Sequence, residues 1–327
     1  QIAHSGPRLP RNPVLYEHAA KKDIGGPEEQ TVNNPMLIAD RDGSVHFVYC
    51  VEYMRVFYSR SSDDGASWSA PVEITAALDK FRPEWPWRVV TTGPGHGIQL
   101  RTGRLVIPLW LATAKGSPHA NAVGATIYSD DSGKTWHRGA IAMPNNKETS
   151  GTSENIVAEL SDGRVLMHAR TRSKPDRKAV TISPDGATGW SKPTFDAALF
   201  EPVCMSSLVA FPKSIDGRAR LLFSNPHTLD ADGPGAKAKP GDRRTRKNLS
   251  VKLSYDDGQT WPINKTLEPG PSAYSDLAVL PDGTILCLYE SGKPGATRPN
   301  SQRTDWPYAT LTLARFNLEW LTDGKDR

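Results

Sequence analysis

Short apolar runs rich in β-branched residues recur along the chain, and each follows a turn dipeptide that ends in glycine. The five dipeptides are Asp42-Gly43, Thr102-Gly103, Asp162-Gly163, Asp216-Gly217 and Asp282-Gly283. They advance from residue 42 to residue 282 in four steps, so their mean period is 60 residues. Because an Asp-Gly turn before a β-rich run favours a hairpin, the pattern predicts a repeated antiparallel unit.

A second motif is interleaved with these turns and marks a further hairpin. The pattern S-x-D-x-G-x-[ST]-W occurs at residues 61–68, 129–136 and 254–261, and residues 183–190 form a degraded fourth copy. In such a turn we expect the aspartate to accept hydrogen bonds and the glycine to take a positive φ. The tryptophan would then pack under the turn, so we interpret the boxes as structural.

The repeat predicts an all-β protein. No segment has the pattern of a long amphipathic helix, and 27 glycines and 27 prolines interrupt the chain throughout. A unit of about 60 residues suits one four-stranded blade of a β-propeller. The 327 residues would then hold about 5.4 blades, although a closed ring needs a whole number. Residues 1–30 contain no strand-turn-strand unit, so the shortfall lies at the front.

Composition and charge narrow the possible functions. The 37% hydrophobic and 8% aromatic residues exclude a disordered chain, and no apolar run reaches the length of a membrane span. The net charge of +4 permits an anionic substrate, while the one dense basic run, residues 243–247, lacks the interleaved aromatics of a nucleic-acid site.

The cysteines and histidines indicate no metal or redox chemistry. Cys50, Cys204 and Cys287 each lie in an apolar stretch, so we expect small buried side chains rather than a disulfide or a nucleophile. The eight histidines include no pair at metal-ligand spacing on a helix, and no calcium-loop pattern is present. We expect neither a metal nor a cofactor.

Four boxes on this period resemble the Asp-box (BNR) exo-α-sialidases, or neuraminidases, of bacterial and lysosomal type. Further segments similar to that family are residues 92–100, 224–226, 271–277 and 314–321. The resemblance implies a single domain over residues 1–327 with the six-bladed β-propeller of the family. Residues 35–61 resemble the second blade, so the first blade would be missing from this chain or incomplete.

A sialic acid carries a carboxylate on its anomeric carbon, and guanidinium groups match the geometry of a carboxylate. The family uses three arginines for this purpose. Arg170, at the end of the strand after Asp162-Gly163, matches one of them, and Arg246, eight residues before the box residue Ser254, matches another. The resemblance therefore implies that Arg170 and Arg246 bind the substrate carboxylate.

The same carboxylate would repel an attacking Asp or Glu, whereas a neutral tyrosine avoids the repulsion if a nearby carboxylate takes its proton. Sialidases are the tyrosine-nucleophile exception among glycosidases. Tyr274 matches the family's nucleophile, and Glu154, 16 residues before Arg170, matches its partner base. Glu290 resembles the carboxylate that orients the first arginine of the family.

Two family residues have no counterpart that we can place. One is the arginine of an N-terminal R-I-P motif, which residues 11–15 echo only faintly, and the other is a loop Asp that acts as general acid/base. The fractional number of blades and the missing family residues thus both indicate that the chain is N-terminally truncated relative to the family. We expect it to hydrolyse sialosides poorly or not at all on its own.

The resemblance implies retaining exo-hydrolysis of terminal α-linked sialic acids on glycans, glycoproteins or gangliosides. Two alternatives stay within the fold: sialyl transfer, and hydrolysis of a related nonulosonic acid. A third is a sugar-binding or scaffold propeller without catalysis. A secreted or periplasmic location is expected, or a lysosomal one in a eukaryote, and no targeting signal is visible in the chain.

Overall fold

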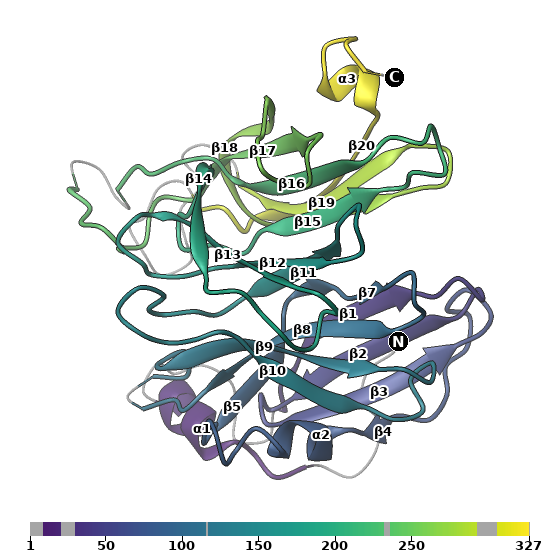
Figure 1. The fold of residues 1–327 in the computed structure, drawn as a ribbon. Helices are drawn as coiled ribbons and strands as arrows, with labels where there is room; N and C mark the ends of the chain where they lie inside the picture. Colours follow the sequence, from purple (N-terminus) through teal and green to yellow (C-terminus); the bar gives the residue numbers. More distant parts are fainter. Residues whose placement is uncertain (1–8, 21–29, 116, 232–235, 293–305, 327) are drawn as a thin grey trace. The chain divides into compact units, whose positions relative to one another are not determined.

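The structure, a computed structural model, describes residues 9–20, 30–115, 117–231, 236–292 and 306–326 (Figure 1). Its regular structure is almost entirely β, which confirms the all-β prediction, and its helices are short: α1 (Pro13–Ala20), α2 (Thr75–Asp79) and α3 (Leu318–Leu321). The strands are β1 (Val32–Ala39), β2 (Val45–Val51), β3 (Arg55–Ser61), β4 (Val72–Glu73), β5 (Val89–Thr92), β6 (Gly95–His96), β7 (Ile98–Gln99), β8 (Leu105–Ala112), β9 (Ala122–Ser129), β10 (His137–Met143), β11 (Asn155–Glu159), β12 (Val165–Ala169), β13 (Arg177–Ser183), β14 (Thr194–Phe200), β15 (Ser207–Phe211), β16 (Arg220–Pro226), β17 (Lys247–Ser254), β18 (Ile263–Val279), β19 (Ile285–Ser291) and β20 (Thr310–Phe316).

The chain divides into two compact units. Unit 1 consists of Gln1–Ile156, Gly163–Val165 and Thr181–Lys192, and unit 2 consists of Val157–Asp162, Leu166–Val180 and Pro193–Arg327. The single domain expected over residues 1–327 stays a prediction.

Unit 1 contains two sheets, drawn in purple to blue in Figure 1. The first has the strand order β4-β3-β2-β1-β6, and the second has the order β10-β9-β8-β5, with β7 also paired to β8. Every residue of β8 is buried, as expected of a continuous apolar run covered on both faces. A third sheet, of order β11-β12-β13-β14, has its residues divided between the two units.

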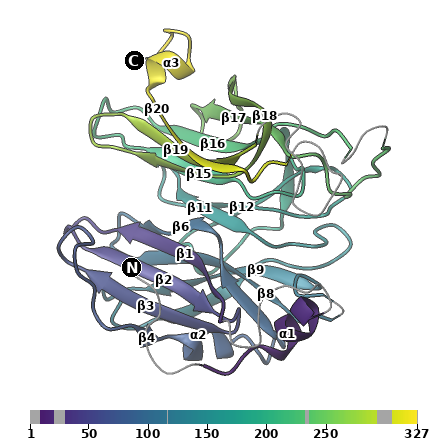
Figure 2. The same ribbon diagram turned by 180° about the vertical axis from the view of Figure 1, so that it is seen from behind.

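Unit 2 contains a six-stranded sheet of order β15-β16-β17-β18-β19-β20, which Figure 2 shows from behind. Its central strand β18 has 17 residues and serves two antiparallel partners in succession. The first part, from Ile263 to Pro271, pairs with β17, and the part from Ser272 to Val279 pairs with β19. Two repeats of the sequence therefore share one strand.

The five predicted glycine turns are confirmed. They join β1 to β2, β7 to β8, β11 to β12, β15 to β16, and β18 to β19. Their glycines all have φ between 80° and 97°, a left-handed conformation that glycine adopts without steric cost. The five repeats thus occupy four sheets in which sequence neighbours pair, as in propeller blades.

The Asp boxes also have the predicted geometry. In the first box Asp63 accepts hydrogen bonds from the amide of Ser67 at 2.9 Å and from its hydroxyl at 2.6 Å, and Gly65 has a φ of 83°. The indole of Trp68 donates back to the Gly65 carbonyl at 3.0 Å. The degraded copy keeps the bonds from an amide and a hydroxyl to its aspartate, from Thr188 to Asp185, with one residue fewer between the two, but the indole nitrogen of Trp190 has no hydrogen-bond partner among the described residues.

Each unit has its own hydrophobic core. In unit 1 the core gathers side chains from β1 to β10 around Trp87, Ile107 and Leu109. In unit 2 it lies on one face of the six-stranded sheet, with Leu222, Val251 and further residues of β16 to β19. Cys50, Cys204 and Cys287 are free and fully buried, which confirms their reading as small apolar side chains.

Candidate active site

Four of the five site residues predicted from the sequence belong to unit 2, and each lies in or next to a strand. Arg170 directly follows β12, and Arg246 directly precedes β17. Tyr274 lies in the second part of β18, and Glu290 lies in the neighbouring strand β19. Residues distant in sequence therefore meet because β17, β18 and β19 pair side by side in one sheet.

Both arginines contact the phenol of Tyr274. The Nη1 of Arg170 donates a hydrogen bond to the Tyr274 hydroxyl oxygen at 3.1 Å. The guanidinium carbon of Arg246 lies 5.2 Å from the centre of the Tyr274 ring, within the range of a cation–π contact. Two permanent positive charges thus flank one phenol, and an anionic group next to that phenol would be strongly favoured.

Arg246 is 8% exposed and is held from two sides. Its Nη2 donates to the carbonyl of Val203 at 2.6 Å, and its Nη1 donates to the hydroxyl of Tyr308 at 2.7 Å. Arg243 also donates to the Tyr308 hydroxyl, at 3.4 Å. Burial raises the pKa of Tyr308, so its hydroxyl stays protonated and keeps a proton to donate while it accepts from the arginines.

Glu290 is bonded to the backbone that carries Tyr274. The amide of Tyr274 donates to the Oε2 of Glu290 at 3.0 Å. Burial raises the pKa of Glu290, and both this hydrogen bond and the charge of Arg246 oppose the rise. Glu290 therefore fixes the strand position of Tyr274.

The surroundings of Tyr274 are positively charged beyond the two predicted arginines. Partial burial lowers the pKa of Arg172, the charges of Arg170 and Arg243 lower it further, and the charge of Asp242 opposes this fall. Such mutual repulsion arises only where guanidinium groups lie close together. This end of unit 2 therefore suits an anionic ligand.

Glu154, the predicted base, belongs to unit 1. It is 6% exposed, and the hydroxyl of Ser153 donates to its Oε2 at 2.6 Å. Burial raises the pKa of the nearby Tyr53 hydroxyl, and the charge of Glu154 adds to this rise. Its role as the proton acceptor of Tyr274 stays a prediction.

Near the N-terminus, the segment that faintly echoes the R-I-P motif precedes a helix rather than an inner strand. Helix α1 begins at Pro13, and the Nε of Arg11 lies 3.7 Å from the Glu52 carboxylate. The buried Asn12 is also tied to this region, since its side chain donates to the Arg88 carbonyl at 2.9 Å. Arg11 thus has an acidic partner in unit 1, and the absence of the family's first arginine from this segment stays a prediction.

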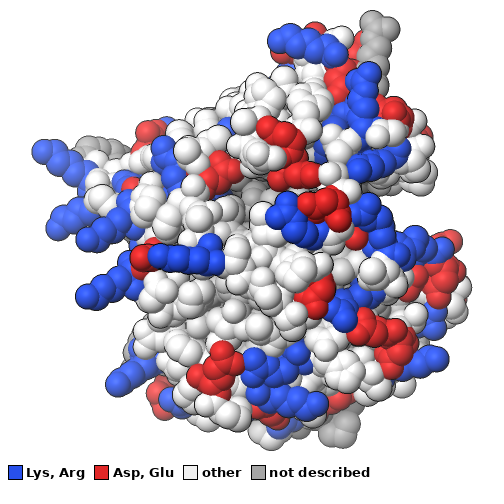
Figure 3. All heavy atoms as spheres, viewed as in Figure 1, with Lys and Arg blue, Asp and Glu red and all other residues white. Residues whose placement is uncertain are grey.

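No group of three or more His, Cys, Asp or Glu side chains in the described part of the chain could hold a metal ion. No helix among the described residues is long and apolar enough to cross a membrane. On the face shown in Figure 3, basic and acidic side chains are interspersed.

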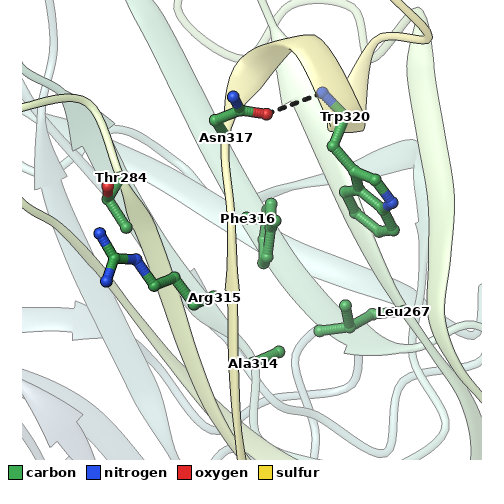
Figure 4. Close-up of a pocket in the computed structure, with 7 residues that line it drawn as sticks. All are labelled: Leu267, Thr284, Ala314, Arg315, Phe316, Asn317 and Trp320. Atoms are coloured by element: carbon green, nitrogen blue, oxygen red, sulfur yellow. Dashed lines mark hydrogen bonds between the residues drawn. The ribbon is translucent and has the colours of Figure 1, made fainter.

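A pocket of about 650 Å³ lies elsewhere in unit 2, around α3 (Figure 4). Phe316, Trp320 and Leu267 form its apolar side, and Asn317 begins the helix by accepting a hydrogen bond from the Trp320 amide at 2.9 Å. None of the predicted site residues lines this pocket, so its shape does not bear on the chemistry at Tyr274.

The sequence model of one family, described as a BNR repeat-like domain, matches residues 18–287. A sialidase from Micromonospora viridifaciens is 35% identical over 270 residues, which cover 80% of this chain and 35% of the relative. Sialidase-3 from Homo sapiens is 30% identical over 275 residues, which cover 73% of this chain and 62% of the relative.

The chain belongs to the sialidase family of BNR-repeat proteins. It spans between about a third and two thirds of the length of these relatives. Among solved structures, the microbial sialidase Hz136 aligns with a TM-score of 0.70 and 26% identity, covering 93% of this chain and 56% of that one. The intramolecular trans-sialidase from Ruminococcus gnavus shares the fold, with a TM-score of 0.60 and 23% identity over 84% of this chain and 52% of that one.

Sequence reasoning missed three residues of this candidate site. Tyr308 anchors Arg246, and the buried pair of Lys178 and Glu201 lies behind both arginines. A signal existed for the pair, because Lys178 directly precedes the apolar residues Ala179 and Val180 in β13 and Glu201 begins the apolar stretch up to Met205. Nothing in the sequence around Tyr308 distinguishes it from an ordinary strand aromatic.

Proposed function

We propose that the protein of which this chain is a part is a retaining exo-α-sialidase that uses Tyr274 as its nucleophile. The observation that carries the proposal is the contact of one phenol with two guanidinium groups. The Nη1 of Arg170 lies 3.1 Å from the Tyr274 hydroxyl oxygen, and the guanidinium carbon of Arg246 lies 5.2 Å from the centre of the ring. Membership of the sialidase family supports the same reaction class, a glycoside hydrolysis.

In the first step Arg170 and Arg246 bind the substrate carboxylate as charge-assisted hydrogen-bond donors. The Tyr274 oxygen attacks the anomeric carbon while its proton passes to Glu154, and the bond to the leaving sugar breaks. The leaving oxygen takes a proton from a general acid, which by family resemblance is an Asp outside this chain. A covalent tyrosyl sialoside results.

In the second step water attacks the anomeric carbon from the face that the leaving sugar vacated. The general base removes the water proton, the Tyr274–carbon bond breaks, and the proton held by Glu154 returns to the phenolate. Two inversions at one carbon retain the anomeric configuration. A sugar hydroxyl in place of water would give sialyl transfer, the reaction named for a structural relative.

Glu290 has a supporting part in this proposal. Its carboxylate accepts from the Tyr274 amide, and its other oxygen would orient the first arginine of the family, which by resemblance lies in a preceding blade. The substrates would be sialylated glycans, glycoproteins or gangliosides, in a secreted, periplasmic or lysosomal setting.

We also propose that the complete domain is a six-bladed propeller whose first blade lies outside this chain. Unit 2 offers a face for another sheet, because Leu288, Leu311 and Leu313 are 48%, 72% and 62% exposed. Leu288 pairs directly with Leu313, so the three leucines share one face of β19 and β20, opposite the core. Without that blade the chain would lack an acid and an arginine, and its turnover would be slow or absent.

The experiment uses a fluorinated sialic acid that traps the covalent intermediate, with the full-length protein and mass spectrometry of its peptides. The parent is expected to carry the label on Tyr274, and Tyr274→Phe is expected to carry none. Tyr289→Phe is the matched control, since Tyr289 lies on the other face of the sheet and donates to Glu268 at 3.0 Å. Labelling that persists in Tyr274→Phe refutes the assignment of Tyr274 as the nucleophile. A parent protein that is never labelled refutes the proposed sialidase activity.

A further inference from the structure

A buried ion pair lies behind the two arginines. The Nζ of Lys178 is 2.8 Å from the Oε2 of Glu201, and their side chains are 0% and 1% exposed. Burying two charges costs several kcal/mol per ion, and the pair repays this cost only if further hydrogen bonds satisfy its remaining atoms. The groups that hydrogen-bond to the Glu201 carboxylate and to the Lys178 ammonium therefore show which parts of the chain the pair holds in place.

One of these partners is the backbone beside Arg170. The amide of Thr171, the residue that follows Arg170, donates to the Oε2 of Glu201 at 3.3 Å. Burial raises the pKa of Glu201, and the charges of Lys178 and Arg170 oppose that rise. The loop that leaves β12 is thus tied to Glu201 at the position where Arg170 turns toward Tyr274.

The other partner is the backbone that anchors Arg246. The amide of Cys204 donates to the Oε1 of Glu201 at 3.0 Å, and the Cys204 carbonyl accepts from the Nζ of Lys178 at 2.6 Å. The preceding residue, Val203, has a φ of 59°, which is strained for a β-branched side chain. Its carbonyl is the acceptor of the hydrogen bond from Arg246.

We propose that the Lys178–Glu201 pair is a positioning element that sets Arg170 and Arg246 at a fixed separation to receive one carboxylate. The pair bonds to the residue after Arg170 and to the strained turn that holds Arg246, so one rigid group fixes both arginines before a ligand arrives. This inference rests on the proposed function for the identity of the ligand. It makes Lys178 and Glu201 positioning residues that do not touch the substrate.

The main variant replaces both charges at similar volume, Lys178→Met with Glu201→Leu. Removing the whole pair avoids a lone buried charge, so the fold should survive. In the full-length protein we expect KM for a sialoside to rise about 10- to 100-fold with a smaller change in kcat, because the arginines bind the carboxylate in the ground state and the transition state alike. Glu201→Asp, which keeps both charges but shortens the side chain that carries the carboxylate, is the second variant should the double variant not fold, and we expect KM to rise about tenfold.

The matched control is another buried pair of unit 2, Arg220 with Asp326. The Nε of Arg220 is 2.7 Å from the Asp326 carboxylate, the side chains are 0% and 3% exposed, and the pair bonds further to Asp216 and Arg218. Arg220→Met with Asp326→Leu should leave KM within about twofold of the parent. An equal rise in KM in both double variants would mean loss of general stability and would overturn the proposal.

Crystal structures of the parent and the Lys178/Glu201 variant test the positioning without any ligand. We expect the contacts of Arg170 with Tyr274 and of Arg246 with Val203 to be lost or displaced in the variant. If both contacts persist, or if KM does not change, the positioning role is wrong even when the parent is an active sialidase. A parent that shows no turnover refutes the proposed function instead, and the crystallographic comparison still decides the role of the pair.

Discussion

At the scale of single residues, the site depends on how Arg246 is anchored. Its two Nη atoms are already committed to Val203 and Tyr308, at 2.6 and 2.7 Å. A guanidinium group fixed in this way loses little conformational entropy when a carboxylate arrives, which is the general advantage of a pre-formed site. Lysine could not reproduce two such bonds from one planar group.

Tyr308→Phe tests this anchoring. The substitution removes the oxygen that accepts from Arg246 and from Arg243 but keeps the aromatic ring that packs edge-on against Trp306. We expect about a tenfold loss of affinity for free sialic acid, measured by titration calorimetry, with little change in Tm. Tyr289→Phe is the control that should keep the affinity of the parent, and an unchanged affinity in Tyr308→Phe would show that the anchor is dispensable.

The sequence predicted the residues that carry a family motif but not their support. Local motifs and spacing were enough to predict four residues that come together in unit 2: Arg170, Arg246, Tyr274 and Glu290. Glu201 and Tyr308 act through contacts with residues 30 and 62 positions away, and no local pattern encodes such pairs. The placement of Glu154 relative to Tyr274 stays a prediction, because the two residues belong to different units.

At the scale of elements, the repeat was predictable because its signals are local. A glycine at positive φ, or an aspartate that bonds to an amide four residues later, needs only neighbouring residues, so the sequence alone predicts turns and boxes. The sharing of β18 by two repeats was not predicted, because strand pairing depends on register between distant segments.

The second Asp box allows a pH-dependent test. The hydroxyl and amide of Thr135 donate to Asp131 at 2.6 and 2.8 Å, and they lower its pKa from an ordinary 3.8 to about 2. A carboxylate with a lowered pKa adds stability above its unfolded value, and this stability is lost as the pH falls through its folded value.

Thr135→Val removes the hydroxyl donor at nearly constant volume. We expect Tm to fall by about 2–4 °C at pH 6, and the difference from the parent to shrink as the pH falls from about 4 toward 2. Thr135→Ser, which keeps the hydroxyl, should stay near the parent throughout. Thermal unfolding followed by circular dichroism measures both, and a difference that does not depend on pH would contradict the role of the charged Asp131.

At the scale of the whole molecule, the exposed leucines of β19 and β20 bear on the proposed first blade. A side chain that is 72% exposed contributes little to stability, whereas the same side chain covered by another sheet contributes about 1.5–3 kcal/mol. The same substitution should therefore have different effects in the present chain and in a protein that contains the additional blade.

Leu311→Lys with Leu313→Lys is the corresponding variant. In the 327-residue chain we expect Tm to change by no more than about 1 °C, and in the full-length protein we expect a fall of several degrees. Differential scanning calorimetry of both lengths gives the comparison. Equal, small changes in the two proteins would show that no sheet covers this face.

The shared strand β18 also limits how the sequence can evolve. Loops between repeats can gain or lose residues, but the stretch from Ile263 to Tyr274 is clamped by one neighbour at its start and another at its end. The pairing of β18 with β19 is regular from Ser275 to Val279, and side chains alternate between faces there, so a single residue inserted in this part would turn Leu277 out of the core. Indels at residues 275–279 are therefore expected to disrupt the strand that carries Tyr274, whereas the shifts of register between Glu268 and Pro271 and between Ser272 and Ser275 mark where the strand already accommodates an irregularity.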